Sequence, residues 1–202
     1  GEEARKVDFL FETAGYAPPS QARRLQAAVA CYARVMAELE WETTGSGRTA
    51  PEASEWTGGM REVYGELVER GGDQPLPLLL TTDKERGESR SRRLTEARPA
   101  LPTAITILMI GSTTVGLFAL ATFTLPNVRR NTQIFALVGL TTVLVVVQLA
   151  IADMDRPYTG LIKVPSTDLE RVSGDLAEDF GEDHPGRPLP CDEQGRPLAT
   201  RA

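Results

Sequence analysis

Two long stretches without any ionisable side chain constrain this chain more than any other feature. One ends at Arg129, and the other begins after Arg130. As helices rising about 1.5 Å per residue, their apolar cores at residues 103–125 and about 132–152 each span about 30 Å, the thickness of a bilayer's hydrocarbon core. Lipid offers the backbone no hydrogen-bond partners, so even the β-branched part of the second stretch should be helical. We therefore predict two transmembrane helices.

The alternative for such stretches is a buried helical hairpin in the core of a soluble protein. Two uncharged stretches of this length, so close together in the sequence, favour the membrane interpretation. The connection at residues 126–131 is short and polar. It predicts that the two helices are antiparallel neighbours.

Basic residues around the predicted hairpin indicate its orientation. Cytoplasmic flanks of membrane helices carry an excess of lysine and arginine. The connection between the helices has Arg129 and Arg130, whereas the segment before the first helix has more: Lys84, Arg86, Arg90, Arg92, Arg93 and Arg98. We expect a multi-pass protein of the cell (plasma) membrane with both termini of this chain in the cytoplasm.

The two cysteines, Cys31 and Cys191, lie in very different sequence contexts and form no CxxC spacing. We predict no disulfide framework, in agreement with a reducing cytosol. The chain begins at Gly1 without a methionine, and we expect this start to be a truncation or a processing point.

The predicted fold class is an all-α membrane protein, with a transmembrane helical hairpin, a helical cytoplasmic lobe and a disordered C-terminal tail. The lobe comprises residues 1–98 and the hairpin residues 99–156. A short post-membrane segment follows at 157–180, with an amphipathic helix over 166–180. Residues 181–202 are rich in proline, glycine and charge, which predicts disorder.

The lobe is predicted to be helical from its apolar periodicity. One helix has Ser20 at its N-cap position, and two more cover about 52–70 and 78–98. Apolar residues recur at three- and four-residue steps, which indicates a packing face on the first two helices. These residues are Leu25, Ala28, Val29, Tyr32, Val35, Met36 and Leu39 on the first, and Trp56, Met60, Val63, Tyr64 and Leu67 on the second.

Residue types that support catalysis or metal binding are scarce. The single histidine, His184, lies in the predicted disordered tail, which argues against a histidine triad or a zinc site. The net charge of -6 argues against a nucleic-acid partner, because phosphate binding requires a concentrated basic face. We predict no enzyme activity, no cofactor, and no catalytic or metal-binding residue.

Small and polar residues gather in the first membrane helix at Gly111, Ser112, Thr113 and Gly116. Small residues allow close helix packing, and hydroxyl groups can line a pore. Packing, including self-association of membrane helices, is the simpler interpretation, and a pore-lining role is the alternative.

Acidic residues mark the end of the second helix. Ionisable groups at membrane depth are candidates for function, but Asp153 and Asp155 lie at a helix end where they can reach water, and Arg156 can pair with one of them. A functional role and simple marking of the membrane boundary both remain open.

The segment Asp153–Gly160, here called the exit segment, contains Asp155-Arg156-Pro157-Tyr158-Thr159-Gly160. It resembles the C-terminal signature of the bacterial bestrophin-like family of unknown function, with Tyr158 in place of the usual phenylalanine. Further similar positions lie upstream at Tyr32, Glu40-Trp41 and Arg90–Leu94. The resemblance implies two additional membrane helices before the lobe, and its name implies a likeness to oligomeric anion channels.

Two functional hypotheses follow. In the first, the chain belongs to an oligomeric bestrophin-like ion channel, with the small polar face of the first helix lining the pore and the exit segment shaping its mouth. In the second, it is a non-conducting membrane anchor that presents the lobe to cytoplasmic proteins. Its expected partners are the lipid bilayer, further copies of itself and, in the second hypothesis, those proteins.

Overall fold

The computed structural model describes residues 1–45, 47–71, 75–97, 101–123, 130–155, 158, 160 and 164–198. The chain forms two compact units. The first, here called the lobe, combines residues 1–97 with residues 164–202, and the second comprises residues 98–163. The lobe is thus built from both ends of the sequence, whereas residues 1–98 alone were expected to form it.

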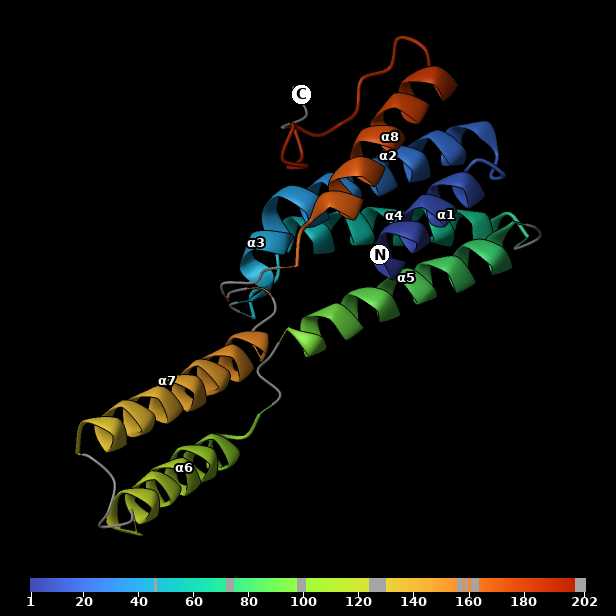
Figure 1. The fold of residues 1–202 in the computed structure, drawn as a ribbon. Helices are drawn as coiled ribbons and strands as arrows, with labels where there is room; N and C mark the ends of the chain where they lie inside the picture. The colour runs from blue at the N-terminus through green and yellow to red at the C-terminus, as the bar shows by residue number, and fades with distance from the viewer. Residues whose placement is uncertain are drawn as a thin grey trace. The chain divides into compact units, whose positions relative to one another are not determined.

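The lobe is a helical bundle (Figure 1), and its buried apolar side chains form one continuous core. Helix α2 lies at its centre and packs against α1, α4 and α8, while α5 packs along α1. Alanines on several sides of α2 are buried, and their small side chains let three neighbouring helices approach closely. The elements are α1 (Glu2–Ala14), α2 (Pro19–Val35), η1 (Met36–Glu40), α3 (Trp41–Thr44), α4 (Pro51–Glu69), α5 (Leu76–Glu96) and α8 (Thr167–Asp183).

The two predicted apolar faces, one over α2 and η1 and the other on α4, are buried apart from the half-buried Leu39 of η1 and Trp56 of α4. The predicted N-cap at Ser20 is wrong, because the N-cap of α2 lies two residues earlier, at Pro18, and the helix begins at Pro19. Proline is favoured in the first helical turn, where its missing N–H would have no helical partner and its fixed φ suits the helix. Helix α4 begins in the same way at Pro51.

Residues 181–198 are ordered where the sequence predicted disorder, whereas α8 agrees with the amphipathic helix predicted at 166–180. Helix α8 buries Leu169, Val172, Leu176 and Phe180 in the core of the lobe. Residues 184–198, here called the strap, then return along α2, with an isolated antiparallel bridge between Cys191 and Pro197. The composition predicted disorder because the strap has few apolar residues, but hydrogen bonds and a covalent link, described below, hold it instead.

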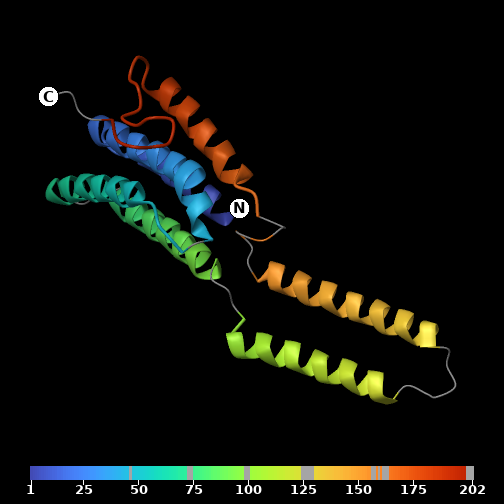
Figure 2. The same cartoon turned by 90° about the vertical axis from the view of Figure 1, so that its left-hand side faces the viewer.

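The second unit consists of α6 (Thr103–Phe123) and α7 (Arg130–Met154), which lie side by side in both views (Figures 1 and 2). Their bounds agree closely with the two predicted membrane helices. The predicted polar connection lies mostly outside the described residues, as do Arg156 and Pro157 of the exit segment.

Candidate functional site

Helices α6 and α7 expose apolar side chains along their whole length. Both are long and apolar enough to cross a membrane, and none of their described side chains in these stretches is buried. Phe118 is 71% exposed and Phe135 is 78% exposed. A water-soluble protein rarely exposes a continuous apolar surface of this size, so the alternative of a buried core hairpin does not hold. Lipid or other membrane helices would cover these surfaces.

The small polar residues of α6 point in more than one direction. Thr113 faces α7, where Gln148 Nε2 donates a hydrogen bond to its Oγ1 at 2.6 Å. Ser112 is exposed, and its hydroxyl donates to the Met109 carbonyl of the preceding turn at 3.0 Å. A Cβ added at Gly111 or Gly116 would meet no atom within 4 Å. The close packing predicted for these glycines is therefore absent within the described unit.

A pocket of about 480 Å³ lies between the first half of α6 and the second half of α7. Its walls are mostly apolar, and Gln148 and Asp155 supply polar groups. The Asp155 carboxylate accepts a hydrogen bond from the backbone N–H of Leu101 at 3.0 Å. This bond links the end of α7 to the residues that precede α6.

Gly160 of the exit segment lies against the end of α7. A Cβ at this position would be 2.9 Å from the backbone oxygen of Asp153 and 2.6 Å from its Oδ1. A side chain there would force the backbone to shift, which gives a steric reason for glycine in the exit segment. Tyr158, the predicted interfacial aromatic residue, is half-buried.

A buried ion network lies in the lobe where η1 faces α5. Glu40 is fully buried, and its Oε1 accepts hydrogen bonds from Arg90 Nε and Arg93 Nη2, both at 2.8 Å. Arg93 Nε donates to Glu3 Oε2 of α1 at 2.6 Å. The backbone N–H of Ala50 donates to Glu40 Oε2 at 3.1 Å. One carboxylate thus connects α5 to η1 and to the start of α4.

The electrostatics of this network favour the ionised carboxylate. Burial alone would raise the pKa of Glu40, but the hydrogen bond from Arg90 and the charges of Arg90 and Arg93 lower it below its ordinary value of 4.5. A π-helical turn inserts an extra residue into a helix and often occurs at a functional position. Here the η1 turn contains Glu40, the residue that both arginines bind.

Most of these residues were singled out by the resemblance, but their mutual contacts could not be read from the sequence. Arg93 lies over the Trp41 ring at 5.3 Å, and Arg86 lies over the Tyr32 ring at 4.4 Å. Arg86 also pairs with Asp83. Three arginines of the basic flank that was used to orient the hairpin are therefore engaged inside the lobe.

Cys31 and Cys191 form a disulfide between α2 and the strap. The prediction that the chain has no disulfide was therefore wrong. The two cysteines are 160 residues apart in the sequence, and only the return of the strap along α2 brings them together. Disulfides persist in oxidising compartments and are rare in the cytosol, so this bond also removes the argument for a reducing environment.

Comparison with known proteins agrees with these features. The family model described as the Bestrophin-like domain matches residues 1–169, which include the ion network, both apolar helices and the exit segment. Comparison with curated proteins and with solved structures gives no match. The resemblance seen in the sequence is confirmed, and the chain belongs to the bestrophin-like family.

Proposed function

We propose that this protein is a subunit of an oligomeric ion channel, in which α6 and α7 form a transmembrane hairpin. The observation that carries this proposal is the face of α6 formed by Gly111, Ser112 and Gly116. It is exposed in the unit, while Thr113 binds α7. Glycine and serine in a membrane helix favour contact with other helices or with water over contact with lipid chains. A ring of copies would supply both, with this face towards the pore.

The proposed pore contains no charge along α6, so charge selection would fall to groups near its mouth. Asp153 and Asp155 are acidic residues at the end of α7, and we propose them for this role. Channels select ions through rings of charged side chains or carbonyl groups. The family membership points to channel-like membrane proteins, and we propose no catalytic role for this chain.

Ion flux from liposomes containing the full-length protein tests the proposal, with both anion and cation gradients and with empty liposomes alongside. Ser112→Leu and Gly116→Leu should block flux, because each places a bulky side chain on the proposed pore face. Ala121→Leu is the matched control, since it adds the same kind of side chain at an exposed position nine helical residues after Ser112, on the opposite side of α6. Absence of flux from correctly inserted protein, or equal loss in all three variants, would contradict the channel.

We further propose that the lobe lies outside the cytoplasm, the reverse of the expected orientation. The Cys31–Cys191 disulfide supports this side. Short loops follow the positive-inside rule most strictly, so Arg129 and Arg130 would then place the connection between the helices in the cytoplasm. The lobe arginines weigh less against this orientation, because long domains cross the membrane largely regardless of their charge.

Cysteine labelling in intact cells tests the orientation. In a Cys31→Ser/Cys191→Ser background, Glu69→Cys adds a thiol at an exposed position of α4, and Asn131→Cys adds one at the start of α7. A membrane-impermeant maleimide should label position 69 in intact cells and position 131 only after permeabilisation. The opposite pattern would restore the orientation that the basic flanks predicted.

The second candidate function is a non-conducting anchor that presents the lobe to partner proteins. The observation in its favour is that the lobe has a complete apolar core of its own, joined across both ends of the sequence. Under this hypothesis the inserted protein conducts nothing, and crosslinking in the membrane captures a defined partner on the lobe.

A further inference from the structure

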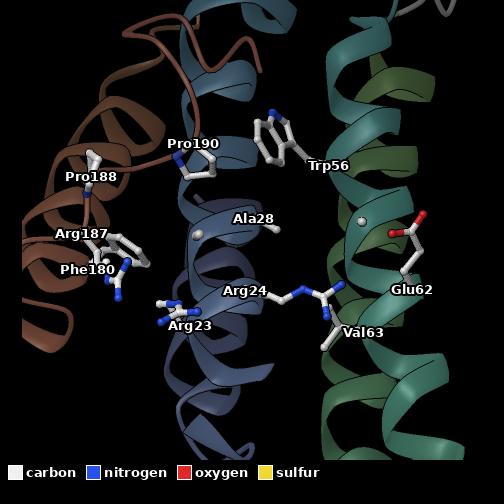
Figure 3. A pocket seen from close by; sticks show the side chains of 12 residues that line it. Arg23, Arg24, Ala28, Trp56, Glu62, Val63, Phe180, Arg187, Pro188 and Pro190 are labelled. Carbon is white, nitrogen blue, oxygen red and sulfur yellow. The ribbon is translucent and has the colours of Figure 1, made fainter. Parts of the chain in front are cut away.

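A pocket of about 370 Å³ opens on the lobe between α2, α4, the end of α8 and the strap (Figure 3). This volume lies within the range of small-molecule sites in proteins, about 300–1,000 Å³. Its accessible apolar surface comes mainly from Trp56 of α4 and from Pro188 and Pro190 of the strap. Beneath it, Phe180 and Val63 are buried in the core of the lobe and form a floor that is fixed by packing.

The polar lining of this pocket is strongly basic, although the whole chain has a net charge of -6. Arg23 and Arg24 come from α2 and Arg187 from the strap, against the single carboxylate of Glu62 (Figure 3). Arg24 pairs with Glu66 outside the pocket lining. Arg23 and Arg187 take part in none of the ion pairs within the described part of the chain, so both guanidinium groups can bind a ligand.

The wall that carries Arg187 is held in place at several points. The disulfide ties the strap to α2 at Cys191. Trp56, which lines the pocket, donates its indole N–H to the Gly195 carbonyl at 2.7 Å. The His184 ring is 2.8 Å from Gln26 Oε1 at the start of the strap. A site whose walls are fixed before binding loses less entropy when a ligand enters.

We propose that this pocket binds a small organic anion, a carboxylate with an apolar body. The carboxylate sits between Arg23 and Arg187, whose planar guanidinium groups match its geometry. The apolar body lies over Ala28, against Pro190 and the Trp56 indole. This inference concerns the lobe alone and does not depend on conduction through the membrane helices.

Calorimetric titration of the full chain in lipid nanodiscs tests the proposal, with empty nanodiscs subtracted. The probes are 2-naphthoate and 2-naphthamide, which share an apolar body and differ in charge. The naphthoate should bind at least tenfold more tightly. Arg23→Gln/Arg187→Gln should weaken it by about 10- to 100-fold, since a hydrogen bond to a charged group contributes about that factor. Arg61→Gln, an exposed arginine of α4 outside the pocket, is the matched control.

A second variant tests the pocket without changing its charge. Gly59 lines the pocket, and a Cβ there meets nothing within 4 Å, so Gly59→Leu should fill the space without disturbing the fold. Gly65→Leu on the exposed side of α4 is its control. Loss of naphthoate binding in Gly59→Leu, with the control unchanged, supports the site. The proposal is overturned if naphthoate does not bind, if the amide binds equally, or if test and control variants behave alike.

Discussion

Removing the Cys31–Cys191 disulfide is expected to destabilise the lobe strongly. The bond joins residues 160 apart, but the membrane helices between them should remain inserted when the lobe unfolds. The flexible part of the closed loop is then roughly 100 residues, for which loop-closure entropy gives about 4.7 kcal/mol. Measured disulfides typically contribute about 2–4 kcal/mol, so we expect Cys31→Ser/Cys191→Ser to lower the free energy of unfolding by about 3–5 kcal/mol.

Urea unfolding of the full chain in detergent micelles measures this loss. Fluorescence of Trp41 and Trp56 reports the lobe, because both side chains pack against its core and these are the chain's two tryptophans. In reducing agent, the wild-type protein should unfold at the same urea concentration as the double variant. Reducing agent should not affect the variant itself, because the sequence contains no other cysteine.

The experiment shows whether the disulfide stabilises the lobe or contributes nothing to its stability. If the variant retains the wild-type free energy of unfolding within about 0.5 kcal/mol, as for an ordinary surface substitution, the disulfide does not stabilise the lobe by loop closure. A loss of the expected size accompanied by faster proteolysis after Glu193 would show that the strap is the element released. That result would also connect the disulfide to the wall of the proposed anion pocket.

Three further perturbations test the lobe and the membrane unit. Glu40→Gln leaves the buried Arg93 and the half-buried Arg90 without their shared carboxylate and should lower the free energy of unfolding by about 3–5 kcal/mol. Because the pKa of Glu40 is lowered in the fold, its contribution to stability is present above pH 4.5 and should be lost as the pH falls below that value. Acid unfolding of the wild type and of Glu40→Gln measures this: the difference in stability between them should shrink at low pH. Gly195→Ala should lower the free energy of unfolding in the urea assay by more than about 1 kcal/mol, since φ is +80° and the new Cβ would lie 2.6 Å from α2 backbone atoms. Gly186→Ala is its control: φ is similar, but the new Cβ would meet open space, so the loss should be smaller. Gln148→Leu removes the hydrogen bond to Thr113 and should weaken α6–α7 association by about 0.6–1.7 kcal/mol, measured by steric trapping of the protein in bicelles.

Elements with a strong local pattern could be predicted closely from the sequence. The two uncharged stretches gave helices within a few residues of their observed bounds, because length and apolar composition alone decide what can span a bilayer. The apolar periodicity of α2 and α4 correctly identified their buried faces, since helical geometry places residues three and four apart on one side.

The candidate sites depended on contacts that no local pattern contains. The resemblance singled out Glu40 as a position but not its partners, because only the packing of α5 against the π-helical turn buries it between two arginines. The strap looked disordered because its composition offers little apolar burial, but Gly195 fits against α2 and Cys191 reaches Cys31.

The sequence by itself determined the family, the helical class and the two apolar helices, because these follow from residue order over short distances. The tertiary structure decided the disulfide, the ordered strap, the ion network and the basic pocket. Each of these joins residues that are far apart in the sequence, such as the 160 that separate Cys31 from Cys191. Their proximity results from how the helices pack, and side-chain periodicity carries no information about packing partners so distant along the chain.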